Sequence, residues 1–323
     1  MKHLSILVPK GENNLSSIVG CYKLFTRANQ LFEKAGRAAV FKVELIGAEK
    51  TTGFYGDLFS VKPHRVFSIL RKTDLIIIPS LNHNYVQSTT ANAAVIEWIK
   101  RRHAKGAEIA SICTGAFLLA ATGLLDGKRC STHWSAADEL KRMHPSIELA
   151  ADKIITDECG IYTNGGAYSF LNLLLYLIEK FYDRSTALQC AKIFEIEFDR
   201  QSQNEFMIFS GQKEHDDAAI LKAQSYIEKH YDDKISIEHL AKRSNTSRRN
   251  FDRRFIKATG LTALEYMQRV KVEAAKKSLE NSRRTVSEIM FQVGYSDAKA
   301  FRELFSKCTG HTPLAYRTRY GKV

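Results

Sequence analysis

The chain has 323 residues, of which 44% are hydrophobic and 26% charged, as in ordinary folded proteins, so wholesale disorder is excluded. This length exceeds what one hydrophobic core usually supports and predicts two domains. No apolar run approaches the roughly 18 to 20 residues of a membrane span, and the N-terminus shows no cleavage site, so we expect a cytoplasmic protein without membrane contact. The six cysteines are scattered, which favours reduced thiols and no metal site.

The first part of the chain, to about residue 210, alternates strand-like and helical segments. Apolar runs such as LIIIP lack alternation and are typical of strands buried on both faces of a mostly parallel sheet. Helices are expected at 15–36 and 91–105, a hairpin in ITDECGIYTNGG (155–166), and helices between 167 and 198. The other strands are expected in HLSILVP, FKVELIGA and AEIASIC. We therefore predict an α/β domain over 1–198.

A polar, glutamine-rich stretch, DRQSQNEFMIFSGQKEHDD, separates this part from a segment with helical periodicity only. We predict a linker over 199–217 and an all-α domain over 218–323. From Lys242 to Lys322 there are 19 lysines and arginines against 7 aspartates and glutamates, whereas the rest of the chain has 29 against 28. A basic segment of this kind suits nucleic acid or an anionic membrane surface, and a solvated face is the alternative.

The last quarter contains an internal repeat. Residues 236–266 and 285–316 align with a shift near 50, which brings Phe251 and Phe255 onto Phe301 and Phe305. Ser236 and Thr285 are expected to cap short helices, and Asn245 and Gly294 suit the left-handed residue of a tight turn. Each copy then has a second helix starting near Ser247 or Ser296, as in a helix-turn-helix. A long helix over 262–281, with Leu264, Met267, Val270 and Ala274 on one side, would space the two copies.

These residues closely resemble the AraC/XylS family of transcription activators over about 218–320. The second copy carries the family signature V-x-E-I-x-x-x-V-G-Y from Val286 to Tyr295 and G-x-T-P-x-x-Y-R from Gly310 to Arg317. The resemblance implies promoter DNA and RNA polymerase as partners. It places Ser247, Arg248, Arg249, Asp252 and Arg253 in a major groove, with Asp297, Ala298, Lys299, Ala300 and Arg302 in the second copy. Glu303 stands where the family usually has arginine, so we expect the second copy to read bases less.

The segment Ala107 to Trp134 resembles the ThiJ/PfpI branch of the glutamine amidotransferase-like superfamily, which implies a flavodoxin-like fold. With an AraC-type tail, the chain is similar to the GlxA-like regulators. The run S-I-C-T-G-A places Cys113 between strand and helix as in a nucleophile elbow, where Gly115 permits a tight turn and the helix dipole favours a thiolate. His133 matches the histidine that approaches this cysteine in the superfamily.

Catalysis in these relatives also needs an acidic residue, whose place falls near Ser16 here, with Glu12 as a possible substitute. No matched pair of cysteine and acidic residue is evident. We therefore predict that the first domain is a non-catalytic sensor for a small nitrogenous metabolite, without a cofactor, and that the protein dimerises through this domain. Its ligand would lie at the carboxyl ends of the strands. The expected wall residues are Cys113, Thr114, His133, Trp134, Thr163, Asn164, Gly165 and Gly166. The alternatives are a cysteine-dependent hydrolase or deglycase with a DNA-binding tail, and a purely structural cysteine.

Overall fold

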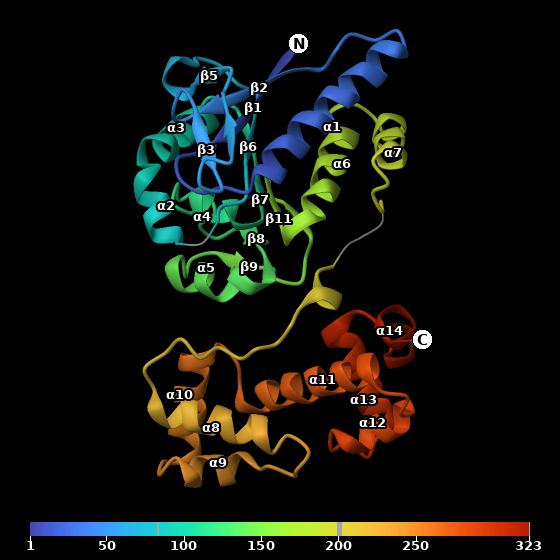
Figure 1. Cartoon of the computed structure of the whole chain (residues 1–323). Coiled ribbons are helices and arrows are strands. Elements are labelled where there is room, and N and C mark those ends of the chain that lie inside the picture. Colours follow the sequence, from blue (N-terminus) through green and yellow to red (C-terminus); the bar gives the residue numbers. More distant parts are fainter. Residues whose placement is uncertain (83, 199–201, 323) are drawn as a thin grey trace. The chain divides into compact units, whose positions relative to one another are not determined.

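The computed structural model describes residues 1–82, 84–198 and 202–322. The chain divides into two compact units, Met1–Gln203 (unit 1) and Asn204–Val323 (unit 2), drawn blue to yellow-green and yellow to red in Figure 1. The linker proposed over 199–217 straddles this division, and its residues 199–201 lie outside the described residues. No helix within the described residues has both the length and the apolar character to cross a membrane.

Unit 1 is built on a seven-stranded sheet with the order β10-β11-β7-β6-β1-β2-β5. Every neighbouring pair is parallel except β10 with β11 at one edge, which confirms the mostly parallel sheet. Central strands such as β6 are buried at every residue, as unbroken apolar runs predict. The strands are β1 (Lys2–Val8), β2 (Phe41–Gly47), β5 (Arg65–Val66), β6 (Leu75–Ile78), β7 (Glu108–Ile112), β10 (Ile155–Asp157) and β11 (Ile161–Asn164).

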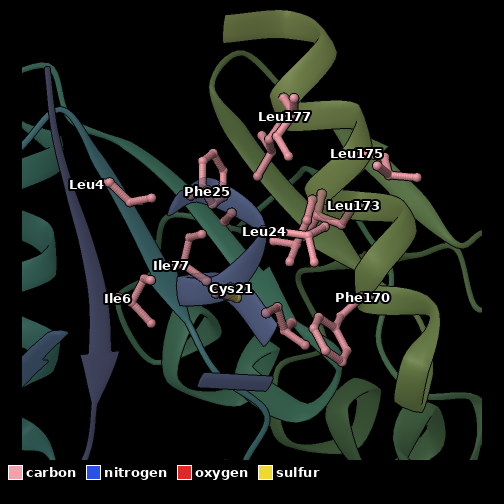
Figure 2. Packing of buried hydrophobic residues seen from close by; sticks show 14 of the residues in the cluster. Leu4, Ile6, Cys21, Leu24, Phe25, Ile77, Phe170, Leu173, Leu175 and Leu177 are labelled. Atoms are coloured by element: carbon pink, nitrogen blue, oxygen red, sulfur yellow. The ribbon is translucent and has the colours of Figure 1, made fainter. Parts of the chain in front are cut away.

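Helices cover both faces of this sheet (Figure 1). One face packs against α1 (Leu15–Lys34), α6 (Phe170–Phe181) and α7 (Arg184–Ile193). Figure 2 shows Leu24 and Phe25 of α1 between Leu4 of the sheet and Leu173 and Leu177 of α6. The other face packs against α2 (Tyr85–Ala91), α3 (Ala93–His103), α4 (Ala116–Ala120) and α5 (Ala137–Met143), where Trp98 is fully buried. Two apolar cores thus hold the strand ends in place.

The hairpin expected in 155–166 is present, and its turn uses left-handed residues at Cys159 and Gly160, with φ of 55° and 86°. Several short elements were not predicted. They are β3 (Thr52–Phe54) paired with β4 (Phe59–Val61), β8 (Arg129–Cys130) paired with β9 (Glu148–Leu149), and the single turns η1 (Phe67–Ile69), η2 (Cys113–Gly115), η3 (Trp134–Ala136) and η4 (Ala167–Ser169). Elements of two or three residues carry too little periodicity to be read from a sequence.

Unit 2 is helical within its described residues and contains two small cores. Its helices are η5 (Asn204–Phe206), α8 (Ala218–Lys229), α9 (Ile237–Arg243), α10 (Arg248–Thr259), α11 (Ala263–Asn281), α12 (Val286–Gln292), α13 (Ala298–Thr309) and α14 (Pro313–Tyr320). Phe251 and Phe255 of α10 lie in the first core, and Phe301 and Phe305 of α13 lie in the second. The repeat seen in the sequence is therefore a repeat of packing.

The predicted start and turn signals are confirmed in both copies. Ser236 accepts from the backbone N–H of His239, and Thr285 forms a capping box with Glu288. Asn245 and Gly294 have φ of 48° and 75°, the left-handed conformation that the turn between the two helices requires. The second helix of the second copy starts near Ser296, as predicted, and its cap is the next residue, Asp297.

The apolar side expected for α11 is not buried as a whole, because Leu264 is 55% exposed whereas Met267 is buried. At 3.6 residues per turn, Tyr266 and Met267 lie on one side of the helix, and Val272 and Leu279 lie on nearly the opposite side. The first pair belongs to the first core and the second pair to the second core. A helix that lies between two cores buries two faces, so a single apolar stripe does not describe it.

Candidate functional site

The first candidate surface for DNA is the N-terminal half of α10. Its buried face is anchored by Phe251 and Phe255, which are fully buried. The predicted contacts Ser247, Arg248, Arg249 and Arg253 are exposed, and Asp252 is half-buried. Ser247 caps the helix by accepting from the N–H of Asn250. The helix therefore buries its aromatic face and turns its cationic face to solvent, as a groove-reading helix must.

Two arginines of this face already have partners in the free protein. Arg248 donates to Glu238 of α9, and its Nε lies 3.8 Å from a carboxylate oxygen of Asp252. Arg253 donates from Nη2 to the side-chain oxygen of Asn250 at 2.8 Å. Sequence reasoning missed Glu238 and Asn250, because both act through a neighbouring arginine. Their oxygens orient guanidinium groups that would otherwise be free to rotate.

The corresponding surface of α13 is less basic. Asp297, Ala298, Lys299, Ala300 and Arg302 are all exposed, as is Glu303. The Asp297 carboxylate accepts from the backbone N–H groups of Lys299 and Ala300 at 2.8 and 3.1 Å, so it caps the helix. Two cations, Lys299 and Arg302, remain on this face, against three arginines on α10. The second copy therefore has fewer side chains suited to reading bases.

In unit 1, Cys113 follows the buried strand β7 and precedes α4, in the place expected for an elbow. Its φ is +53°, a left-handed conformation that costs a non-glycine residue about 1–3 kcal/mol. The tight turn is thus made at Cys113 itself, and the role predicted for Gly115 is wrong, because Gly115 has φ of −57°. Gly115 serves close packing instead, since a Cβ there would lie 2.6 Å from the carbonyl oxygen of Pro79.

His133 is half-buried, and burial lowers its pKa. Its Nδ1 accepts from the N–H of Ser135 at 3.2 Å and lies 2.7 Å from the Ser135 hydroxyl, so the ring caps η3. Within 1–82, 84–198 and 202–322, no hydrogen bond joins Cys113 to His133 or to a carboxylate. Glu12 is exposed, and the hydroxyl of Ser17, next to the position expected for the acid, accepts from Ser80 N–H and donates to Asn14.

Several residues that were expected to line the ligand site form hydrogen bonds within unit 1. Thr114 donates to the carbonyl of Leu81 at 2.6 Å and is bonded to Ser80. Thr163 accepts from Ser131 N–H at 2.7 Å, and Asn164 donates to the carbonyl of Ile154 at 3.0 Å. Both are fully buried. These residues hold the strand ends together.

Trp134, Gly165 and Gly166 surround a residue that the sequence did not single out. Gln203, the last residue of unit 1, is 2% exposed, and its side-chain oxygen accepts from Trp134 N–H at 3.3 Å. A Cβ on Gly165 would lie 2.0 Å from its Nε2. The glycine pair was a usable signal, because adjacent glycines often mark a close approach of another group.

Tyr85 of α2 is a second residue that was missed near the elbow. Its ring stacks on Phe117 of α4, with centroids 3.8 Å apart. Burial, with smaller contributions from Glu139 and Cys113, raises the pKa of Tyr85 to about 12. The phenol, which is protonated at neutral pH as in any tyrosine, is thus a still weaker acid.

Comparison with known proteins finds separate matches within unit 1 and within unit 2. Residues 24–180 match the model of the DJ-1/PfpI family, and residues 240–319 match that of a helix-turn-helix domain. The chain is 27% identical over 236 residues to the HTH-type transcriptional regulator GlxA of Rhizobium meliloti, covering 69% of each chain.

A second relative is the HTH-type transcriptional regulator GbdR of Pseudomonas aeruginosa, 21% identical over 224 residues. That match covers 68% of this chain and only 59% of GbdR. A solved structure of a ThiJ/PfpI family protein from Pseudomonas syringae has a TM-score of 0.51 and 18% identity, covers 76% of this chain and 89% of that one, and supports the fold. The chain thus combines a domain of the DJ-1/PfpI family, with a flavodoxin-like sheet, and an AraC-type helix-turn-helix domain, and over 69% of its length it is similar to an HTH-type transcriptional regulator.

Proposed function

We propose that this protein is a sequence-specific, ligand-responsive transcription regulator of the cytoplasm. Unit 2 binds promoter DNA through α10 and α13, and unit 1 binds a small nitrogenous effector without converting it. The observation that carries the proposal is the pair of matched helices whose phenylalanines are buried while basic side chains are exposed, Arg248, Arg249 and Arg253 on α10 and Lys299 and Arg302 on α13. If these exposed faces had no binding partner, there would be no reason for the same arrangement to occur in both copies.

On α10 we assign Arg248, Arg249 and Arg253 to the groove, with Ser247 and Asp252 beside them. On α13 we assign Lys299 and Arg302, with Asp297, Ala298 and Ala300 close to the backbone of the duplex. Arginine is the residue most often used to read guanine, whereas small residues and helix N-termini position a protein on phosphates. This division agrees with a stronger sequence dependence under the first copy.

The test is binding of the full chain to a duplex selected by repeated binding from a random-sequence pool, measured against unselected random duplex over a range of salt concentrations. The proposal expects a specific complex, with an affinity for both duplexes that falls steeply as salt releases counterions. Equal binding to the two duplexes, or none at low salt, would overturn it.

For unit 1 we propose a sensor rather than an enzyme. The backbone of Cys113 has the strained conformation of an elbow. However, His133 is hydrogen-bonded to Ser135, and Glu12 is exposed to solvent. The general base and the acid that a catalytic cysteine needs are therefore not placed beside it. A second candidate, a cysteine-dependent hydrolase or deglycase, is favoured only by the strained Cys113. Product formation from small amides or methylglyoxal that disappears in Cys113→Ser would establish the enzyme.

We further propose a homodimer formed through unit 1 and an interaction of the DNA-bound protein with RNA polymerase. Both follow from the resemblance to activators of this type. A homodimer places two unit 2 copies on one operator and predicts paired half-sites. Light scattering of the full chain, with and without operator DNA, measures the number of chains directly.

A further inference from the structure

The side chain of Gln203 fills a pocket in unit 1 that is built for a carboxamide. Its Nε2 lies 2.9 Å from the carbonyl oxygens of Thr132 and Ala151 and 3.1 Å from that of Lys153. Its Oε1 accepts from Trp134 N–H at 3.3 Å. The NH2 group thus faces three carbonyl oxygens, which can only accept, and the Ser131 hydroxyl oxygen at 3.4 Å, whose own proton goes to the carbonyl of Lys153. The carbonyl oxygen of the amide faces a group that can only donate.

The pocket depends on two glycines after β11. Gly165 has no left-handed φ, yet a Cβ there would lie 2.0 Å from Nε2 of Gln203, and a Cβ on Gly166 would lie 3.0 Å from Oε1. Backbone conformation does not require glycine at 165, whereas the room taken by the amide does. The space is therefore matched to a planar group of the size of a carboxamide.

The polarity of the pocket selects among nitrogen compounds. A carboxylate has no proton to give to the carbonyl oxygens of Thr132, Ala151 and Lys153, and it would leave all three facing another acceptor. An ammonium group would satisfy them but would leave the N–H of Trp134 without its acceptor. Only a group with both an NH2 and a carbonyl oxygen satisfies both sides.

We infer that Gln203 is an internal ligand, and that effectors of this protein carry a primary carboxamide that displaces it. This rests on the proposed sensor function of unit 1. The pocket adjoins the elbow, because Thr132, whose carbonyl accepts from Gln203, donates from Oγ1 to the carbonyl of Cys113 at 3.0 Å. An effector whose carboxamide occupies this pocket therefore has the rest of its structure available for the strand ends around Cys113.

Displacement of Gln203 would act on the connection to unit 2. Within unit 2, Glu205 binds His311 Nε2 at 2.8 Å and Tyr320 OH at 3.2 Å, and only Asn204 separates it from Gln203. Both ends of this short stretch are thus held, one in each unit. Removing the amide from its pocket releases one of the two anchors, which gives the pocket a route to the DNA-binding unit.

The experiment uses acetamide, which replaces the group removed in Gln203→Ala. In the full-length variant we expect saturable acetamide binding in the millimolar range by calorimetry, as suits a ligand of so few atoms. Wild type should bind at least tenfold more weakly, since Gln203 competes. Acetate and methylammonium ions, which each lack one half of the amide, should bind neither protein.

The double variant Gly165→Ala/Gln203→Ala is the matched control, since its added methyl group fills the vacated space, and it should lose acetamide binding. If Gln203→Ala fails to fold, Gly165→Ala alone expels the amide and should change the emission of Trp134 in a chain that keeps Gln203. Equal acetamide binding by wild type and Gln203→Ala, equal binding of acetate, or unchanged Trp134 emission in Gly165→Ala would overturn the inference. Acetamide binding by Gln203→Ala without any difference in DNA affinity between this variant and wild type would instead contradict the sensor function while leaving the pocket in place.

Discussion

Phe305 packs edge-on against Tyr316, with ring centroids 5.5 Å apart and planes at 84°, and Phe255 packs against Tyr266 in the same way, at 5.5 Å and 81°. The same hydroxyl pattern repeats as well: Tyr266 donates to Glu228 at 2.6 Å and Tyr316 donates to Glu280 at 2.7 Å. The two helix-turn-helix copies are therefore built to the same plan, although their exposed faces differ.

Because the two cores are built in the same way, removal of a buried ring should destabilise each of them by a similar amount. Phe255→Ala and Phe305→Ala each remove a fully buried ring and should each cost about 3–5 kcal/mol of unit 2 stability. Both tryptophans, Trp98 and Trp134, lie in unit 1, so circular dichroism without a change in tryptophan emission reports unit 2 unfolding. A loss in only one of the two variants would show that the cores are not equivalent.

Because the exposed faces of α10 and α13 differ, we expect the two helices to contribute unequally to the recognition of DNA sequence. Arg253→Ala removes an exposed guanidinium that Asn250 orients and should weaken the specific complex by about 1–3 kcal/mol, with relaxed preference at one or two base pairs. Lys229→Ala, at the end of α8, removes a positive charge outside the proposed face and serves as control. If Arg253→Ala weakened specific and random duplex equally, Arg253 would be a phosphate contact.

Glu238 should restrain DNA binding by holding Arg248. In Glu238→Gln the carboxylate is gone and Arg248 keeps only Asp252, so we expect tighter binding to random duplex and a smaller ratio of specific to random affinity. Glu214→Gln makes the same charge change in the connecting segment. A gain of the same size in both variants would mean that net charge alone is responsible.

Asp217 couples the stability of unit 2 to pH. It caps α8 and accepts from Arg254 at 2.6 and 2.8 Å, and this hydrogen-bonded pair lowers the pKa of Asp217. Because the folded pKa is below the unfolded value of about 3.9, the contribution is complete above that value and is lost as pH falls through the folded pKa. Asp217→Asn keeps a capping side chain, so its deficit against wild type should be present at pH 7 and shrink below about pH 4. A deficit independent of pH would contradict this.

The features that the sequence predicted correctly depend on residues that are close together in the chain. The caps at Ser236 and Thr285 and the left-handed turns at Asn245 and Gly294 follow from local chemistry, and the elbow at Cys113 follows from a motif. The burial of two faces of α11 could not be predicted, because it depends on two cores packing on one helix. Gln203 was missed because its partners lie some 50 to 72 residues away in the chain.

Footprinting of the full chain on its operator, combined with a series of single base-pair substitutions, tests whether both helix-turn-helix copies bind the duplex and whether they contribute unequally. Two helix-turn-helix copies joined by the 19-residue α11 should protect two major-groove segments per chain on one face of the duplex, about 34–36 Å apart. Substitutions under α10, with Arg248, Arg249 and Arg253, should reduce affinity more than those under α13, where Glu303 replaces an arginine. One protected segment per chain, or stronger base dependence under α13, would show that the roles of α10 and α13 are misassigned.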